Sequence, residues 1–298
     1  VGWIEMMAGW FEPILGRMKE AMIATGYLQV DETVIRYLDR EEPGRSLQGY
    51  FWVYAHPGGD VLFDWRTGRS GESPKEFLAG FQGRLQCDGY GVYPKLAQQL
   101  GNTKLFFCVG HFRRKFVEAK DEDRRAIWFL LQFRHLYDIE RRLRRQRAGP
   151  RLREAVRAAE ARPIWERMRK ALALWQPRVL PASRLGKALT YGSERWEGLC
   201  RYVGDGQVEI DSNLVENAIR PTAVGKKSFL FIGHPDAGGR SAILYSILGS
   251  CRSRRINTAL YLSDVLTHLP DLKTSDIKDY TPEAWIRRHP EARLPRIA

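Results

Sequence analysis

The stretch YLQVDETVIRYL, residues 27–38, decides the fold prediction: it alternates like a β-strand and yet carries two acids, Asp31 and Glu32. Alternation with a period of two is typical of a strand. A carboxylate on such a strand is costly unless it is paired or binds a cation, because desolvating an unpaired charge costs several kcal/mol. The stretch therefore predicts a strand whose Asp31 holds a cation, while Glu32 faces the opposite side and is not a ligand.

The bulk composition is that of a folded protein. The chain has 298 residues, 44% of them hydrophobic, which suits one large domain or two modest ones. No apolar run approaches the roughly 18 to 20 residues that cross a bilayer. Residues 1–15 lack the charged start and the cleavage site of a signal peptide, so we expect a cytoplasmic protein without a membrane segment. The first residue is Val1 rather than methionine, so we expect the chain to be cut from a longer protein.

The charge is strongly positive and unevenly distributed. Lys and Arg number 48 against 35 Asp and Glu, a net charge of +13, which is typical of a protein that works on a polyanion such as nucleic acid. The segment 111–170 holds 19 basic and nine acidic residues, or +10 of that net charge. We expect this segment to contact nucleic acid, although a solvated helical face would have a similar composition.

The first part of the chain predicts a helix and five strands. Residues 1–25 are helical in pattern, and strand-like runs begin at residues 27, 49, 60, 83 and 103. The first three runs form a meander, whereas helices connect the later ones, which favours parallel pairing there. Ser73 is expected to cap one of these helices and Pro74 to open it. A three-stranded meander followed by alternating strands and helices is the order of a ribonuclease H-like mixed sheet.

The second part is mainly helical. The pattern is helical from Phe112 to about Arg201; a later helix starts at Asp211 to Asn213 and stops at Pro221, before a strand-like SFLFIG. The expected organisation is a helical lead-in over 1–25, a ribonuclease H-like α/β core over 26–112 and 207–270, a basic all-α insertion over 113–206 and a loosely packed tail over 271–298.

Three acids stand where a site could form: Asp31, Asp88 in CDGYGVY and Glu216 in SNLVENAIRP. Two Asp from neighbouring strands and a Glu from a packed helix can hold two Mg²⁺ ions about 3.5 to 4 Å apart, the arrangement used for in-line phosphoryl transfer. Hard oxygen ligands favour Mg²⁺ or Mn²⁺ over zinc. Each acid also has a structural explanation, since Asp31 and Asp88 could cap turns and Glu216 could pair with Arg220.

Six short sequence motifs resemble, in their order along the chain, the insertion-sequence-66 family of transposases: VDET, CDGYGVY, CVGHFRRKF, IDSNLVENAIRP, GKKSFLFIG and ILYSILGSCRSRRIN. The resemblance implies a DDE transposase with a ribonuclease H-like core, in which Asp31 and Asp88 are the two aspartates and Glu216 is the glutamate. It implies Mg²⁺ or Mn²⁺, as two ions, at these residues. Such enzymes cut DNA at transposon ends and join the freed 3′-hydroxyl to target DNA. The all-α block would be the insertion typical of several DDE groups.

Several side chains near these acids are candidate DNA contacts, because histidine, lysine and the guanidinium fork bind phosphate. They are His111, Arg113, Arg114, Arg220, Lys226 and Lys227. Each of them could instead be structural or solvated. Zinc binding at Cys108 and His111 is disfavoured, because no second pair lies at ligand spacing. Tyr90 and Tyr93 are expected to pack in the core rather than stack on bases.

The predicted function is therefore metal-dependent cleavage and strand transfer on DNA. The expected partners are transposon ends and target DNA, a second copy of the chain on DNA, and accessory proteins of the element. Two alternatives stay open: a nuclease of the same fold that cannot join DNA, and a catalytically silent DNA-binding protein derived from a transposase. Retained nicking without joining would favour the first, and acids that fail to converge would favour the second.

Overall fold

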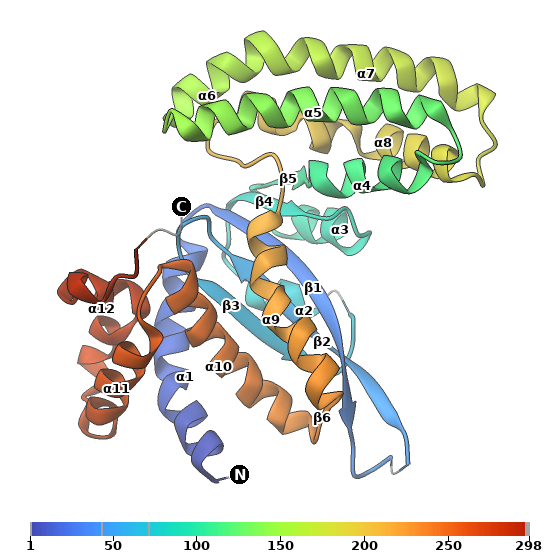
Figure 1. Cartoon of the computed structure of the whole chain (residues 1–298). Helices are drawn as coiled ribbons and strands as arrows, with labels where there is room; N and C mark the ends of the chain where they lie inside the picture. Colours follow the sequence, from blue (N-terminus) through green and yellow to red (C-terminus); the bar gives the residue numbers. More distant parts are fainter. Residues whose placement is uncertain (1, 43, 71, 296–298) are drawn as a thin grey trace. The chain divides into compact units, whose positions relative to one another are not determined.

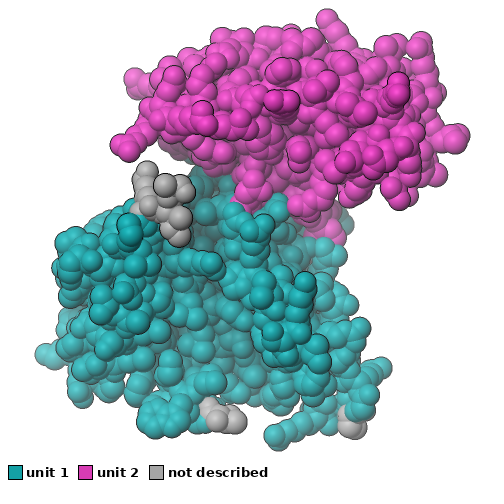
Figure 2. Space-filling model, in the orientation of Figure 1, with its two compact units in different colours: residues 1–85, 92–104, 214–298 teal, residues 86–91, 105–213 magenta. Residues whose placement is uncertain are grey.

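The computed structural model describes residues 2–42, 44–70 and 72–295 (Figure 1). Val1, the first residue of the predicted helical lead-in, lies outside the described residues, and so do residues 296–298, the end of the predicted tail. The chain folds as two units, coloured in Figure 2. Unit 1 contains residues 1–85, 92–104 and 214–298, and unit 2 contains residues 86–91 and 105–213.

A six-stranded mixed sheet organises unit 1. Its strands are β1 (Tyr27–Leu38), β2 (Ser46–Ala55), β3 (Val61–Arg66), β4 (Gly83–Cys87), β5 (Thr103–Phe107) and β6 (Phe231–Ile232), and the last residues of β4 and β5 belong to unit 2. The order is β3-β2-β1-β4-β5, with β6 also paired to β1. The five strands predicted from the sequence are present, and so is a mixed α/β architecture.

Strand direction follows the predicted meander. β1 pairs antiparallel with β2, and β2 antiparallel with β3, whereas β6 pairs parallel with β1 at Arg36 and Tyr37. The Gly83 N–H donates to the Asn102 carbonyl at 2.9 Å. Further along, the Cys108 N–H donates to the Cys87 carbonyl at 2.8 Å, so β4 and β5 run in the same direction.

Helices bury both faces of the sheet within unit 1. One face carries alternate residues such as Phe51, Val53 and Ile35, which pack with Val215 of α9 (Asn213–Phe229) and Ala242 of α10 (Pro235–Ser253). Alternation places the neighbouring side chains on the other face of the sheet. A sheet buried on both faces has no water to satisfy its polar side chains, so each of them needs a partner.

The second face of the sheet packs against two short helices, α2 (Glu72–Phe77) and α3 (Val92–Gln99). Tyr54 stacks on Phe77 with ring centroids 3.6 Å apart, and Trp52 meets Tyr93 edge-on. Tyr93 is fully buried, so its predicted core role is confirmed. Ser73, predicted to cap α2, instead lies in its first turn, and its hydroxyl donates to the Asp64 carboxylate at 3.0 Å.

The remaining helices of unit 1 are α1 (Gly2–Ile23), α11 (Thr258–His268) and α12 (Pro282–Arg288), with 3₁₀ turns over Leu269–Asp271, Thr274–Tyr280 and Pro290–Ala292. Unit 2 holds α4 (Val109–Ala119), α5 (Arg124–Arg145), α6 (Pro150–Val156), α7 (Arg162–Trp175) and α8 (Arg184–Cys200), a π-turn over Arg157–Ala161, and 3₁₀ turns over Gln176–Arg178 and Arg201–Gly204. None of the helices in the described part of the chain is both long and apolar enough to cross a membrane.

Unit 2 has its own core and a buried ion pair. Phe116 and Phe129 stack with ring centroids 4.2 Å apart, and Phe112 meets Phe116 edge-on. Arg157 is fully buried and forks onto the Glu140 carboxylate, with nitrogen–oxygen distances of 2.7 and 2.8 Å. A two-point guanidinium–carboxylate contact satisfies both charges, which allows them to be buried together.

The structure corrects the predicted end of the helix that carries Glu216. Pro221 was expected to stop it, but α9 continues through Pro221 to Phe229, and β6 is only two residues long. Lys226 and Lys227, predicted to precede a strand, therefore lie in the last turn of α9. Pro221 removes one backbone N–H, but buried contacts of α9 on both sides of the proline, at Val215 and Thr222, hold the helix together.

Within the C-terminal tail, which the sequence predicts to be loosely packed, α12 has buried residues. Trp285 and Ile286 of α12 are each only 2% exposed. The Trp285 indole N–H donates to the Asp264 carboxylate at 2.7 Å, and its ring meets Tyr261 of α11 edge-on. A few apolar residues in a mostly polar segment are enough to fix it against α11, which the overall composition did not indicate.

Helix α10 closes the outer edge of the sheet. β3 is an edge strand, and its unpaired backbone groups bond to two fully buried serines of α10. The Ser250 hydroxyl bonds both the N–H and the carbonyl of Val61 at 3.0 Å, and the Ser246 hydroxyl accepts the Phe63 N–H at 2.8 Å. These contacts remove an exposed strand edge, where other chains could pair.

We expect Ser250→Ala to lower the free energy of unfolding by about 1–3 kcal/mol, because it leaves two buried backbone groups of Val61 without partners. Ser241→Ala is the matched control: it removes only an intrahelical bond to Ala237, so a loss below about 1 kcal/mol is expected. Urea unfolding followed by circular dichroism measures both. Equal losses in the two variants would show that the serine at the strand edge has no special role.

Candidate active site

Asp31 lies in the middle of β1, half-buried, opposite Val53 of β2. It shares a face of the strand with Gln29, two residues earlier, which is fully buried. The Gln29 side-chain oxygen accepts the backbone N–H of Val215 at 3.4 Å. This bond fixes the first turn of α9 against the face of β1 that carries Asp31, and Glu216, half-buried, is the next residue of that turn. Both acids belong to unit 1.

Glu32 points to the other face of β1, as expected. Its side chain is 5% exposed, and its carboxylate accepts the Tyr93 hydroxyl at 2.9 Å. Arg69 pairs with the same carboxylate, through its Nε at 3.2 Å. Because a phenol and a guanidinium already compensate this buried charge, Glu32 does not need a cation as its partner.

Asp88 follows the end of β4 and belongs to unit 2. Its carboxylate accepts the backbone N–H of Tyr90 at 2.8 Å, which is the turn contact expected from the DGY sequence. The loop is also held from α8. The Tyr191 hydroxyl donates to the Asp88 carbonyl, and Arg195 Nε donates to the Gly89 carbonyl at 3.1 Å.

Tyr191 and Arg195 were missed by sequence reasoning, because more than a hundred positions separate them from Asp88. They also support each other, since the Arg195 guanidinium lies 4.5 Å from the Tyr191 ring centroid. Burial raises the pKa of the Tyr191 phenol, which therefore stays protonated and able to donate. The one local signal was Gly89, whose φ of 94° is a conformation that L side chains rarely adopt.

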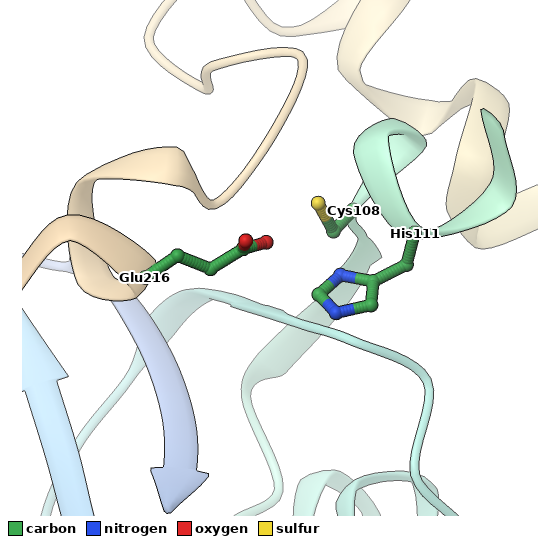
Figure 3. A group of neighbouring side chains, drawn as sticks. All are labelled: Cys108, His111 and Glu216. Atoms are coloured by element: carbon green, nitrogen blue, oxygen red, sulfur yellow. The ribbon is translucent and has the colours of Figure 1, made fainter. Parts of the chain in front are cut away.

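Cys108 and His111 stand at the start of α4 in unit 2, and Figure 3 draws them together with Glu216 of unit 1. The Cys108 sulfur is fully buried and accepts the Ser212 N–H at 3.2 Å. Burial raises the pKa of this thiol to about 11, against the opposing effect of hydrogen bonds from Ser212 and His111. A thiol with that pKa is protonated at neutral pH when no metal is bound to it.

The segment before α9 contains a further buried acid, Asp211, which also lies in unit 2. Its carboxylate accepts both the backbone N–H of Asn213, at 3.3 Å, and the side-chain amide of Asn213, at 2.8 Å. Burial raises the pKa of Asp211, and a hydrogen bond from Tyr137 opposes this effect. Asp211 therefore serves the start of α9, in the place where the sequence predicted that helix to begin.

The predicted DNA contacts occupy two helices. His111 is half-buried and Arg113 and Arg114 are exposed on α4, whereas Arg220 and Lys227 are exposed on α9. Lys226 is half-buried and donates to the Val34 carbonyl of β1 at 3.3 Å. Arg220 follows Glu216 by one helical turn, so the two lie on the same side of α9.

The positive charge of unit 2 divides into two classes. Arginines in ion pairs within the unit include Arg125, Arg141, Arg142, Arg144, Arg153, Arg157, Arg184, Arg195 and Arg201. Exposed cations whose side chains have no ion-pair or hydrogen-bond partner among the described residues include Arg124, Arg134, Arg145, Arg147, Arg151, Arg162, Arg167 and Lys170. The second class keeps its full charge at the surface and is free to meet an anion.

The family model described as Transposase IS66 family matches residues 1–240. This chain belongs to that family. The match includes all of unit 2 and part of unit 1, and it includes Asp31, Asp88, His111 and Glu216. The family assignment suggested by the six sequence motifs is therefore confirmed.

The curated relatives of this IS66-family chain come from Sinorhizobium fredii (strain NBRC 101917 / NGR234). "Uncharacterized protein y4jD" is 28% identical over 284 residues, which cover 90% of this chain and 55% of that protein. "Uncharacterized protein y4hP" is 28% identical over 302 residues (92% and 53%), and "Uncharacterized protein y4qI" is 30% identical over 284 residues (89% and 50%). The chain spans about half the length of these relatives.

We expect Gly89→Ala to lower the stability of this IS66-family chain by about 1–3 kcal/mol, because a side chain is strained at that backbone angle. An added Cβ would also lie 2.8 Å from the Tyr191 hydroxyl and 2.9 Å from Arg195 Nε. Gly91→Ala is the control, since its Cβ would meet nothing within 4 Å. Thermal unfolding compares the two variants. A similar melting temperature for both would contradict the tight fit of the Asp88 loop.

Proposed function

We propose that this chain is the catalytic region of a DDE transposase, which cleaves DNA at transposon ends and transfers the freed 3′-hydroxyl into target DNA. The observation that carries the proposal is membership of a transposase family over a match that includes all three acids. In this proposal Asp31, Asp88 and Glu216 act together. The sheet over 26–112 and 207–270 is a ribonuclease H-like core, and the helices over 113–206 are its basic insertion.

The placement of the three acids supports this role. Asp31 sits on a rigid central strand, and the Gln29 bond to Val215 seats the turn of Glu216 on the same face of that strand. Tyr191 and Arg195 hold the backbone of the Asp88 loop, so its carboxylate is oriented by α8. Catalytic carboxylates need such supports, because a small displacement of a ligand lowers the rate strongly.

The donor set fits the implied metal. Three carboxylates offer only hard oxygen ligands, which suit Mg²⁺ or Mn²⁺, whereas the sulfur of a cysteine is a soft ligand. When bound, as two ions in this proposal, the metal would activate the attacking oxygen and stabilise the leaving oxygen. The protein would supply the remainder: Asp31, Asp88 and Glu216 hold the cations, and nearby cationic side chains hold the DNA strand.

DNA is the proposed partner, and the cationic side chains are its proposed contacts. His111, Arg113 and Arg114 would serve from α4, and Arg220, Lys226 and Lys227 from α9. The exposed arginines of unit 2 that have no ion-pair partner in the described part of the chain would hold the DNA backbone, because guanidinium groups pair with phosphate in two-point contacts. Assembly of several copies on DNA, accessory proteins of the element and a cytoplasmic location complete the proposal.

We expect Asp31→Asn, Asp88→Asn and Glu216→Gln each to reduce cleavage and joining by roughly 10³-fold or more, since each removes a charged metal ligand. The assay incubates the chain with Mg²⁺ or Mn²⁺ and labelled DNA that carries the terminal sequence of its element. Glu20→Gln is the control, because Glu20 is an exposed acid of α1 that pairs only with Arg17 among the described residues. DNA binding by the three variants should stay close to that of the parent chain.

The outcomes separate the alternatives. Nicking without joined products would identify a nuclease rather than a transposase. Salt-sensitive DNA binding with no product, in both the parent chain and the variants, would indicate a catalytically silent DNA-binding protein. Retained activity in any one of the three variants would remove that residue from the proposed site.

We expect the triple variant Arg145→Gln, Arg147→Gln, Arg151→Gln to weaken DNA binding and to reduce the slope of log K against log salt by about 2–3, since each lost phosphate contact lowers it by about 1. Arg141→Gln with Arg142→Gln is the matched control, because these arginines lie in the same basic stretch but pair with Asp138 and Glu160. Fluorescence anisotropy over a salt series measures the slope. An unchanged slope in the triple variant would exclude this surface from DNA contact.

A further inference from the structure

Unit 1 contains a cavity of about 870 Å³. This volume lies in the upper part of the range of roughly 300–1,000 Å³ that is typical of ligand sites. Its lining is mostly apolar and includes Phe63, Pro221, Tyr245, Leu248, Ile256 and Leu294. We call it the α10 cavity, since the last turns of α10 form one wall. Ala218 of α9 also lines it and lies two residues from Glu216, so the cavity and the proposed active site use different faces of that helix.

The wall opposite α10 is built by backbone pairing. Ile256 forms an antiparallel bridge with Arg293, and the Leu294 N–H donates to the Arg255 carbonyl at 2.7 Å. Leu248 is 40% exposed at this site, and Leu294 of the same lining is 46% exposed. The α10 cavity is therefore a formed feature of the fold that leaves apolar surface open to solvent.

Two arginines line this apolar surface. Arg252 and Arg255 both belong to the lining. In the described part of the chain, neither guanidinium group has an ion-pair or hydrogen-bond partner. Their neighbour Arg254 differs, because it pairs with Asp60 at 2.6 Å and Glu283 at 2.7 Å. Within the described ranges, no acid of the fold uses Arg252 or Arg255.

The backbone of Arg255 has a conformation that residues other than glycine rarely adopt. It follows the end of α10 with φ 57°, in the left-handed region that glycine usually occupies at this position. The accompanying bonds, Ile256 N–H to Cys251 carbonyl at 2.8 Å and Arg255 N–H to Arg252 carbonyl at 3.0 Å, form a Schellman motif. Glycine would be more stable here, so this backbone angle is a strain that Arg255 tolerates in the fold.

We propose that the α10 cavity docks an acidic peptide segment of a partner protein, with an apolar side chain in the cavity and carboxylates on Arg252 and Arg255. Guanidinium groups pair two-point with carboxylates, and burial of an apolar anchor supplies most of the affinity. A nucleobase fits less well, because its edges carry donors that need acceptors. The side chains of the lining offer only the hydroxyls of Tyr245 and Thr258 for this purpose.

The test uses the full chain without DNA or metal, so its outcome does not depend on the proposed transposase activity. The probe is a fluorescein-labelled 12-residue peptide of leucine, phenylalanine and glutamate, titrated by fluorescence anisotropy. We expect saturable binding. Replacing the glutamates by glutamine, or the leucines and phenylalanines by alanine, is expected to weaken it at least tenfold. Absence of saturable binding would overturn the proposal.

Matched variants locate the site. Leu248→Glu is expected to weaken binding at least tenfold, whereas Leu260→Glu, at another exposed leucine outside the lining, should change it less than twofold. Equal effects of these two variants would overturn the proposal. So would a labelled oligonucleotide, single- or double-stranded, whose affinity falls in Leu248→Glu while that of the peptide does not, because the cavity would then bind nucleic acid.

Arg255→Gly separates binding from stability. It removes one charge and relieves the left-handed strain, so we expect peptide affinity to fall roughly fivefold while the melting temperature rises by about 2 °C. Arg147→Gly is the control: Arg147 is another arginine at positive φ (50°), but it lies in unit 2. It should raise the melting temperature similarly and leave peptide binding unchanged. An Arg255→Gly variant with undiminished peptide affinity would contradict the proposal.

Discussion

The backbone pairing of β1 is the constraint on which the rest of unit 1 depends. This twelve-residue strand pairs with β2 over ten residues and also borders β4 and β6. Such pairing fixes the register, and with it the face on which every side chain lies, because a shift by one residue would exchange the two faces. Asp31 and Gln29 are held on the face that receives α9, and Glu32 on the face that receives Tyr93. One strand thus separates an acid that is compensated by the protein from an acid that is proposed to bind metal.

The strands were predictable because their signal is local. Alternation in the runs that became β1 to β5, with Gly and Pro between them, reports directly on burial. The start of α9 was predictable for the same reason, since Asp211 and Asn213 are capping residues. The supports of Asp88 were not, because Tyr191 and Arg195 lie about a hundred positions away, and no local pattern relates a phenol on one helix to a carbonyl in a distant loop.

Errors in the prediction also have a common physical cause, which is that tertiary packing overrides local preference. Pro221 disfavours a helix, yet burial of Val215 and Thr222 on either side of it carries α9 onward. The polar composition of the tail favoured loose packing, yet the Trp285 ring is buried and its indole N–H donates to the Asp264 carboxylate. The composition of unit 2 predicted its net positive charge. It could not predict which arginines are buried in ion pairs, as Arg157 is, and which remain at the surface.

Helix α9 contributes to the proposed active site with one side and to the α10 cavity with the other. On one side it carries Glu216 and Arg220, whose position depends on the bond between Val215 and Gln29. On the other side Ala218 and Pro221 contribute to an apolar cavity together with the end of α10. An apolar anchor that enters the α10 cavity would contact the same helix that carries the proposed glutamate. Ligand binding can shift a helix only by as much as its affinity differs between two positions of that helix. Val215 and Thr222, which are buried before and after Pro221, favour the position of α9 seen here, so a ligand in the cavity would have to outweigh these contacts to shift the helix.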